Sequence, residues 1–303
     1  MLHFANQGVT IKEIHNVYAV PKGLQNKWFC RGYHGPPQYN SRGVIQRYLG
    51  FWGCNPTTLN PLSPGDSAPL YVEMMGGSAK IIAKGEELIA QGKYLLATEI
   101  LNKLVFAEPQ NQVARRLLAD AFEQLGYRAE STSVRNTFLQ GAFELRNGQP
   151  GGVPTRSTGP DVVRAMSTEQ WLDFVAISMD PRKAEGLPDV KINLVTPDNG
   201  EEYAVEMSNA TLTTIKGYQA KNPDLTVTVN RADLNQVMMG LASFDDLIKA
   251  GKAKFEGDRS GFDRLRSSLV RFTPDFEILP GTAAKKPSNA PKPFEVRDLV
   301  EVD

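Results

Sequence analysis

The chain contains three histidines, His3, His15 and His34, which are widely spaced. A hydrolytic zinc centre takes three protein ligands and usually draws several histidines from one closely spaced motif. The sequence holds no His-x-His, His-Glu-x-x-His or Cys-x-x-Cys motif. It also lacks the Gly-x-Ser-x-Gly turn of serine hydrolases and the Walker phosphate loop. We therefore expect this chain to bind no zinc and to build no metallohydrolase site by itself.

Arginine and aromatic residues are concentrated between residues 28 and 52. Guanidinium groups and phenol hydroxyls could together recognise a sulfate or phosphate group. The alternative is a packed aromatic cluster beside solvated arginines. Spacing alone favours that alternative, because anion binding requires the side chains to converge. The residues concerned are Arg31, Tyr33, His34, Tyr39, Arg42, Arg47 and Tyr48.

The charge balance gives no sign of a polyanionic partner. Lysine plus arginine and aspartate plus glutamate each total 34, so the formal net charge is zero. This balance does not favour nucleic acid or an anionic membrane as partner, and no apolar run is long enough to cross a bilayer. Cys30 and Cys54 are too few for a disulfide scaffold, and we expect two unpaired thiols. The first residues lack the features of a signal peptide and look like the last turns of a helix, so they do not reveal the compartment.

The elements that must position these residues change character along the chain. Residues 1–70 are rich in Gly, Pro, Asn and aromatic residues, with short helices expected from Thr10 to Val17 and from Ser41 to Gly50. Such a stretch should lie against a larger body. Residues 71–148 have helical periodicity, with Ser78 expected to cap the first helix and repeats of about 34 residues typical of tetratricopeptide-type hairpins. Two hairpins are fewer than usually bury a continuous core, so a neighbouring domain or a second subunit should cover them.

The remaining sequence predicts a linker, an α+β domain and a tail. Residues 149–160 are the linker, residues 161–279 the α+β domain and residues 280–303 the tail. The methionines and leucines of the α+β domain could line a pocket for a lipid, but such faces are more often plain core. Within this domain we expect strands at 191–195, 203–207, 209–215, 225–229 and 254–257, and helices at 168–177, 233–241, 244–249 and 262–272.

Several long, collinear runs of this sequence resemble the alkyl sulfatases of the metallo-β-lactamase superfamily, which include the linear primary-alkyl sulfatases that hydrolyse dodecyl sulfate. The segment 161–279 resembles the sterol-carrier-like C-terminal domain of the same family. The matching runs are Arg31-Gly32-Tyr33-His34-Gly35, Gln46-Arg47-Tyr48-Leu49-Gly50, Tyr71-Val72-Glu73-Met74-Met75-Gly76-Gly77, Glu99-Ile100-Leu101-Asn102-Lys103-Leu104-Val105 and Leu118-Ala119-Asp120-Ala121-Phe122-Glu123-Gln124-Leu125-Gly126-Tyr127.

The resemblance implies an α+β multidomain fold in a fixed order. Residues 1–70 would be the tail of a metallo-β-lactamase-like catalytic domain, and residues 71–148 a helical dimerisation domain that forms a homodimer. The full-length family enzyme is a sulfuric-ester hydrolase with two zinc ions, whose ligands lie upstream of the region that matches Met1. We therefore expect a fragment, a truncated gene product or one part of a split protein, inactive alone. By resemblance, the compartment would be the periplasm or the exterior of a bacterium.

The resemblance also implies a substrate pocket to which His34, Tyr39 and Phe51 contribute. Tyr39 stands where the family has a histidine, and Phe51 where the aromatic residue often carries a hydroxyl group. Both departures imply altered substrate preference or reduced activity. Two other interpretations remain open: a stand-alone dimeric module that binds a lipid or detergent, and a scaffold whose partner the sequence does not reveal. Because the catalytic domain would cover residues 28–52, we expect their aromatic side chains to be exposed in this chain.

Overall fold

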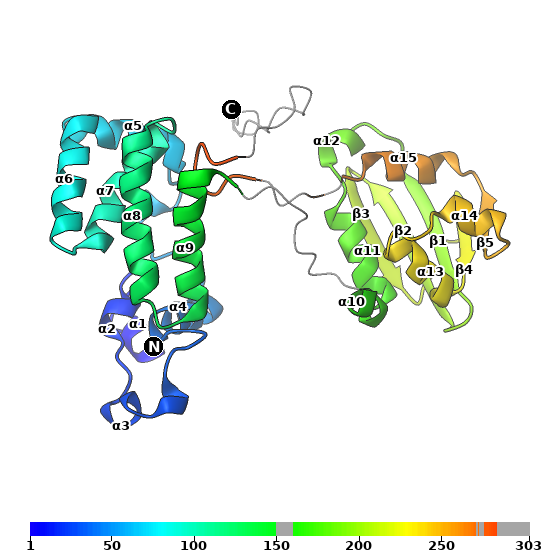
Figure 1. Ribbon diagram of the computed structural model, residues 1–303. Coiled ribbons are helices and arrows are strands. Elements are labelled where there is room, and N and C mark those ends of the chain that lie inside the picture. The colour runs from blue at the N-terminus through cyan, green and yellow to red at the C-terminus, as the bar shows by residue number, and fades with distance from the viewer. Residues whose placement is uncertain (150–159, 271, 273–275, 284–303) are drawn as a thin grey trace. The chain divides into compact units, whose positions relative to one another are not determined.

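A computed structural model describes residues 1–149, 160–270, 272 and 276–283 of the 303-residue chain. These residues form two compact units (Figure 1). The first unit is helical and comprises residues 1–149 together with 276–283. The second is an α+β unit of residues 160–270 and 272. The expected α+β multidomain fold class is therefore confirmed. Within the described residues, no helix combines the length and the apolar character that a membrane span needs.

The beginning of the helical unit consists of short helices joined by turns. Ile14 on α2 and Ile45 on α4 are both buried, and α2 packs against α4. The helix α4 begins at Pro37, four residues before the predicted start, because proline suits the first position of a helix. Thr10 does not cap α2, since its hydroxyl and its amide bind the carboxylate of Glu13. The elements are α1 (Leu2–Ala5), α2 (Ile14–Val17), α3 (Lys22–Gln25), a 3₁₀ turn (Trp28–Cys30), α4 (Pro37–Leu49) and a 3₁₀ turn (Pro56–Thr58).

Five further helices of 11 to 17 residues complete the first unit, and their packing follows the predicted apolar periodicity. Leu101, Leu104 and Leu118 are fully buried at the centre of this core. The predicted hairpins are present as α6 with α7 and α8 with α9, which pack on one another. Ser78 is the first residue of α6 rather than its cap, and its hydroxyl binds the carboxylate of Glu108. The helices are α5 (Pro64–Met74), α6 (Ser78–Ala90), α7 (Tyr94–Ala107), α8 (Gln112–Arg128) and α9 (Thr132–Asn147).

A segment far along the chain returns to this helical core. Leu279 packs with the buried residues of the helices, and Thr282 is fully buried. The amide of Gln149, just after α9, donates to the carbonyl of Thr282 at 2.7 Å. We call residues 276–283 the return segment. The predicted boundary between domain and tail, at residue 280, falls inside it, and the α+β unit is inserted in the chain order between α9 and this segment.

The second unit is a five-stranded mixed sheet in the order β3-β2-β1-β4-β5. The strand β1 pairs in parallel with β4, while the other neighbours are antiparallel. All five predicted strands are confirmed, but the last helix ends at Ser268 instead of Phe272 because the chain then pairs as a bridge at Leu269. The strands are β1 (Val190–Thr196), β2 (Glu201–Ser208), β3 (Thr211–Lys216), β4 (Leu225–Val229) and β5 (Ala253–Gly257).

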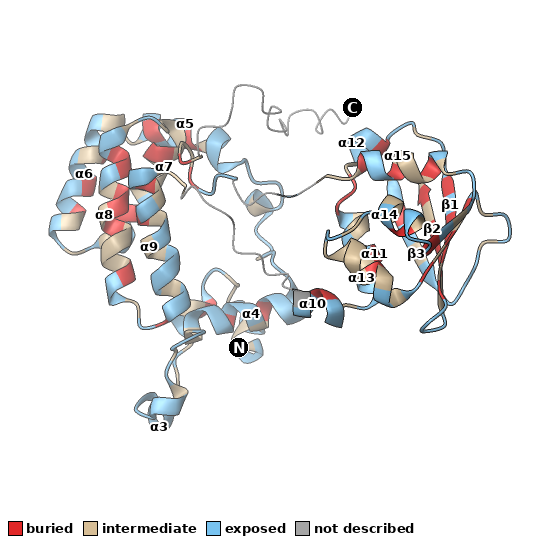
Figure 2. Cartoon of the chain, turned by 45° about the vertical axis from the view of Figure 1, so that its right-hand side comes forward, coloured by how far each residue is buried: buried red, intermediate tan, exposed pale blue. Residues whose placement is uncertain are grey.

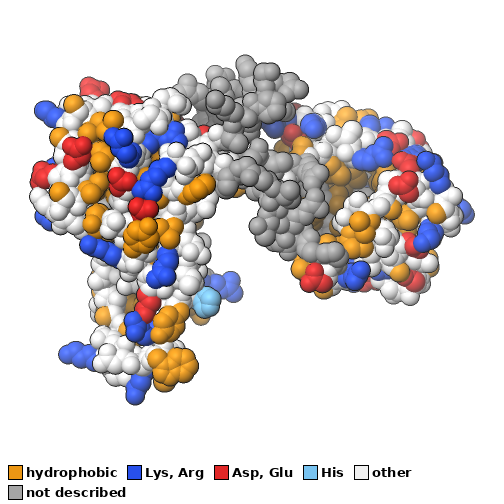
Figure 3. All heavy atoms as spheres, in the orientation of Figure 1, with side chains coloured by type: hydrophobic (Ala, Val, Ile, Leu, Met, Phe, Trp, Pro, Cys, Tyr) orange, Lys and Arg blue, Asp and Glu red, His pale blue; other side chains and the backbone are white. Residues whose placement is uncertain are grey.

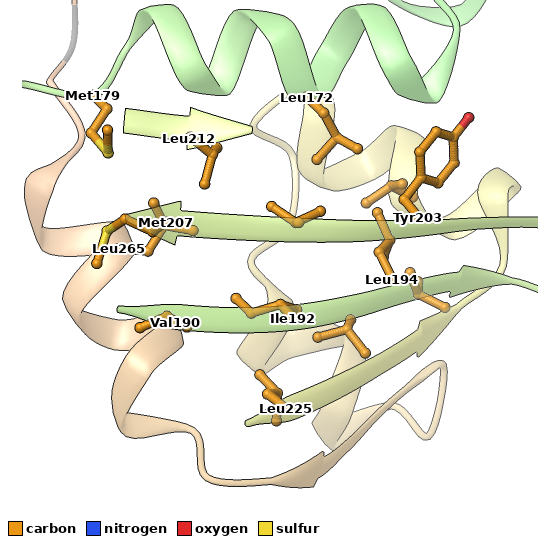
Figure 4. Packing of buried hydrophobic residues seen from close by; sticks show 14 of the residues in the cluster. Leu172, Met179, Val190, Ile192, Leu194, Tyr203, Met207, Leu212, Leu225 and Leu265 are labelled. Carbon is orange, nitrogen blue, oxygen red and sulfur yellow. The ribbon is translucent and has the colours of Figure 1, made fainter. Parts of the chain in front are cut away.

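The helices of this unit cover one face of the sheet. Alternate residues of β1, Val190, Ile192 and Leu194, point into the core together with Leu172 of α11 (Figure 4). Figure 2 shows the buried residues along the strands and on the inner sides of the helices. The helices are α10 (Pro160–Ala165), α11 (Thr168–Ile177), α12 (Pro181–Ala184), α13 (Arg231–Met238), α14 (Phe244–Lys249) and α15 (Ser260–Ser268).

Candidate functional site

His34 lies in a loop that is fixed to the start of α9. Its carbonyl accepts a hydrogen bond from the hydroxyl of Ser131 at 2.7 Å, and the carbonyl of Tyr33 accepts one from the amide of Thr132 at 2.9 Å. The guanidinium of Arg31 forms an ion pair with Glu130. These contacts hold the loop in place through two backbone carbonyls and the Arg31 side chain, and they leave His34 exposed.

Tyr39 lies on the first turn of α4, and its side chain is half exposed. The guanidinium of Arg42 lies 5.8 Å from the centre of its ring, within range of a cation–π contact. Arg42 and Arg47 are five residues apart on the same helix, so they point in directions that differ by about 140°. Since Arg31 is already paired with Glu130, the structure does not bring the three arginines together as one anion site. The tyrosines of this cluster are also exposed, so the described residues form neither one anion site nor a packed aromatic cluster here.

Phe51 follows the end of α4, and 75% of it is exposed. It lies twelve positions after Tyr39, and most of the residues between them are helical, which puts the two side chains about 15 to 18 Å apart along α4. The described residues alone therefore do not form one pocket from Tyr39 and Phe51. Both residues could contact one substrate only if another domain or subunit lay along α4. Their role in substrate binding stays a prediction, as does that of His34.

The expected exposure of the aromatic residues between 28 and 52 is confirmed. Trp28 is 74% exposed, Phe51 75% and Tyr48 68%, whereas Leu172 in the α+β core is 5% exposed. Figure 3 shows hydrophobic side chains on the surface around α3. The contrast with the helix α11 is smaller than expected, because Phe174 and Ile177 on that helix are also exposed. The aromatic surface of residues 28–52 is thus open to a partner.

The three histidines do not form a metal site in the described part of the chain. The ring of His3 hydrogen-bonds Gln7 at 3.1 Å and stacks edge-on against Phe4. His15 keeps a buried ring nitrogen without a hydrogen-bond partner. Among the described residues, no three His, Cys, Asp or Glu side chains gather closely enough to hold a metal ion. A zinc centre therefore does not fit the residues described here.

Family models match most of the chain. Residues 10–148 match a model described as alkyl sulfatase dimerisation, and residues 156–281 match one described as alkyl sulfatase C-terminal. The chain belongs to the alkyl sulfatase family. The matched dimerisation model includes residues 10–70, and α5 crosses residue 70. The predicted boundary at residue 70, between a catalytic-domain tail and the dimerisation domain, therefore stays a prediction.

Individual alkyl sulfatases are similar over nearly the whole chain. A linear primary-alkylsulfatase from Pseudomonas is 40% identical over 92% of this chain and 41% of its own length. The solved structure of a stereoselective inverting sec-alkylsulfatase from Pseudomonas aligns with a TM-score of 0.80 and 37% identity, covering 91% of this chain and 43% of that chain. A sterol carrier protein 2-like protein from Aedes aegypti covers 35% of this chain and 98% of that chain, at 23% identity and a TM-score of 0.28. This alkyl sulfatase chain therefore spans between 41% and 50% of the length of the curated alkylsulfatases it matches.

A hollow on the uncovered face of the sheet was not predicted from the sequence. Its volume is about 290 Å³, and Ile215, Tyr218 and Ala204 form its apolar part. Lys191, Lys221 and Glu206 also line it, and neither lysine forms an ion pair with any described residue. The alternation of side chains along β3 could have indicated this hollow, because the apolar Ile215 lies on the same side of the strand as the polar Thr211 and Thr213.

A polar cluster closes one end of the α+β core. The carboxylate of Glu201 accepts hydrogen bonds from Lys216 at 2.5 Å and from the buried hydroxyl of Thr168 at 3.1 Å. The Lys216 ammonium group holds the pKa of Glu201 below its usual range. Burial raises the pKa of the neighbouring Tyr203, whose hydroxyl points out of the apolar cluster in Figure 4. This cluster ties α11 to the sheet and is a structural feature.

Proposed function

We propose that this chain is the dimerising and substrate-contacting part of a zinc-dependent enzyme that hydrolyses alkyl sulfate esters, such as dodecyl sulfate, to an alcohol and sulfate. The observation that supports the proposal is the similarity to alkylsulfatases across 92% of the chain. The exposed aromatic surface of residues 28–52 adds to it, since large apolar side chains on a surface mark interaction sites. In this proposal the surface packs against the part of the enzyme that has no counterpart in the chain.

The proposed enzyme must take its zinc ligands from outside the described residues. We expect the chain alone to bind no stoichiometric zinc and to hydrolyse no dodecyl sulfate. Metal analysis of the purified chain after dialysis against zinc measures the first expectation. One or more zinc ions held per chain would contradict it.

A hybrid enzyme tests the main proposal. This chain replaces the matching 41% of the Pseudomonas linear primary-alkylsulfatase, and sulfate release from dodecyl sulfate is measured. Activity above that of the truncated relative alone is the expected result. A soluble, zinc-loaded hybrid without activity would argue against the proposal. In this hybrid, the substrate pocket would be lined by His34, Tyr39 and Phe51.

By the same family resemblance, we propose a periplasmic or secreted location for the enzyme.

A second candidate function is binding of an anionic amphiphile by the α+β unit. The hollow beside Ile215 supports it, because an apolar surface next to Lys191 and Lys221 suits an alkyl chain with a sulfate or carboxylate group. Displacement of a fluorescent fatty acid by dodecyl sulfate should be saturable at micromolar ligand. The affinity for dodecyl sulfate should fall at least tenfold in the Ile215→Glu variant and stay unchanged in Glu256→Gln on β5. Equal binding by both variants would exclude this hollow.

We also propose that the chain is a homodimer, in which residues 71–148 form the contact. The matched dimerisation model supports this proposal, and so do two hairpins that are too few to enclose their apolar surface. A dimeric mass by light scattering at micromolar concentration is the expected result. A monomeric mass throughout that range would contradict it.

A further inference from the structure

The start of α9 holds the backbone of residues 31–35, which we call the His34 loop. The carbonyl of Tyr33 accepts a hydrogen bond from the amide of Thr132 at 2.9 Å. The carbonyl of the next residue, His34, accepts one from the hydroxyl of Ser131 at 2.7 Å, although these two residues are 97 positions apart in the sequence. Two neighbouring residues at the start of α9 thus bind two neighbouring carbonyl groups of the loop.

Two further contacts hold the His34 loop at its ends. At one end, the side-chain amide of Asn40 on α4 donates to the carbonyl of Gly35 at 2.8 Å. At the other end, the guanidinium group of Arg31 pairs with the carboxylate of Glu130, between α8 and α9. The backbone is therefore fixed on both sides of His34, by α4 as well as by the start of α9.

The hydroxyl of Ser131 binds the loop instead of capping its own helix. A serine directly before the first helical residue usually accepts a hydrogen bond from an amide in the first turn. The side chain of Ser131 makes no such bond within the described structure, and the residue is only 3% exposed. Because water has little access to this position, the carbonyl of His34 would lose its partner without a replacement if the hydroxyl were removed. Ser131→Ala therefore removes the loop contact and no helix cap.

These contacts leave the ring of His34 available. His34 is exposed, and no described residue forms a hydrogen bond with its imidazole. The ring of His3, by contrast, already binds the side chain of Gln7. A fixed backbone with a free ring suits a residue that must present its ring to a substrate, since a misplacement of about 1 Å can cost roughly a hundredfold in rate.

We propose that Ser131 is a positioning residue, which holds His34 in the orientation needed for contact with the alkyl sulfate substrate. The inference rests on the proposed function, in which His34 lines the substrate pocket. It adds a residue that does not itself touch the substrate and acts through the backbone of the His34 loop. The junction of α8 and α9 then has a part in substrate binding as well as in the packing of the helical unit.

The first arm of the test observes the His34 ring in the full chain by nuclear magnetic resonance. Since the chain contains three histidines, isotope labelling of histidine alone gives three ring signals, and His34→Gln assigns one of them by its loss. Ser131→Ala should move the His34 signal toward that of free histidine and sharpen it, while the signals of His3 and His15 stay in place. Thr98→Val on α7 is the matched control, because it also removes a buried hydroxyl that donates to a carbonyl, and it should move none of the three signals.

The second arm measures dodecyl sulfate hydrolysis by the hybrid with the Pseudomonas enzyme. Ser131→Ala should lower kcat/KM at least fivefold, because the His34 ring is no longer held where it meets the substrate. Ser131→Thr keeps the hydroxyl and should retain kcat/KM within twofold of the parent hybrid, as should Thr98→Val. A merely structural role would lower the activity of Ser131→Ala and Thr98→Val alike, in step with their melting temperatures.

An unchanged His34 signal in Ser131→Ala would overturn the positioning role, and so would a shifted signal with an unchanged kcat/KM or equal losses in Ser131→Ala and Thr98→Val. A parent hybrid that is soluble and zinc-loaded but inactive would count against the proposed function, and the role of Ser131 toward the substrate would fall with it. If Ser131→Ala fails to fold, Ser131→Cys, a weaker donor of similar size, replaces it and is judged by the same criteria.

Discussion

The guanidinium group of Arg115 on α8 donates a hydrogen bond of 2.8 Å to the carbonyl of Gly281, 166 residues further along the chain. Its Nε also donates to the carbonyl of Leu145 near the end of α9, at 3.1 Å. Arg115 is only 7% exposed, and carbonyl oxygens rather than carboxylates surround these donors. The helical unit therefore holds the return segment with a buried cation, and both ends of the inserted α+β unit connect to the same helical core.

Replacing Arg115 should destabilise the helical unit. In Arg115→Met the aliphatic stem remains, but buried carbonyls at Leu145 and Gly281 lose their donor, which costs about 1 to 3 kcal/mol for each unsatisfied group. Chemical denaturation of the full chain, followed by circular dichroism, measures the loss. The control is Arg116→Met, since Arg116 is the exposed neighbour on the same helix. Equal stabilities of the two variants would show that the buried contact contributes little.

Gly281 should not tolerate a side chain. Its φ of +77° lies in the left-handed region, and an added Cβ would stand 2.8 Å from the carbonyl oxygen of Pro109. Gly281→Ala should therefore lower the free energy of unfolding by about 2 to 4 kcal/mol, because a steric clash adds to the cost of the backbone conformation. Gly8→Ala is the matched control: φ there is +87°, but nothing lies within 4 Å of the added atom. It should cost only about 1 kcal/mol. A larger loss of unfolding free energy in Gly8→Ala than in Gly281→Ala would contradict this prediction.

The sequence predicted most helices and strands because apolar periodicity and turn residues act locally. The strand from Leu225 to Val229 and the helices around Leu101 and Leu118 lie where these patterns put them. The return segment could not be predicted in this way. Its composition around Gly281 resembles a tail, and its place depends on Arg115 and Leu145, which are distant in sequence. Long-range contacts of this kind leave no local pattern.

The ion pair between Glu201 and Lys216 should make the α+β unit sensitive to pH at both extremes. The Lys216 ammonium group lowers the pKa of Glu201 from its ordinary value of 4.5, so this stabilisation is present above 4.5 and is lost as the pH falls through the lowered value. Its hydrogen bond to Glu201 raises the pKa of Lys216 above 10.5, so stabilisation present below 10.5 is lost as the pH rises through the raised value.

Thermal melting of the chain between pH 2 and pH 11 measures this dependence. In Glu201→Gln the decline of the melting temperature at both extremes should be smaller than in the wild type. Glu169→Gln changes an exposed carboxylate on α11 and should melt like the wild type throughout. A pH profile of Glu201→Gln that parallels the wild type would assign the pH dependence to other groups.

The candidate site was predictable only in part. The family resemblance identified His34, Tyr39 and Phe51 as one group, but the continuous helix α4 separates Tyr39 from Phe51. The exposed aromatic surface was predictable because the family resemblance implies that residues 28–52 pack against a catalytic domain that has no counterpart in the chain. The exposure of Leu95 and Leu96 was not, since these two residues stand next to buried residues in sequence and only the packing of α7 determines which of them are covered.

The last prediction separates function from stability at Phe51. Because this residue is 75% exposed, Phe51→Ser should change the free energy of unfolding of the chain by less than about 0.5 kcal/mol. Leu118→Ala, at a fully buried position of the helical core, should cost about 2 to 5 kcal/mol. In the hybrid with the Pseudomonas enzyme, Phe51→Ser should nevertheless raise KM for dodecyl sulfate at least fivefold, since an apolar wall of the proposed pocket is lost. Thr57→Ala, an exposed change six residues away, should leave KM unchanged. A hybrid in which Phe51→Ser retains the parental KM, while the chain remains as stable as expected, would remove Phe51 from the substrate pocket.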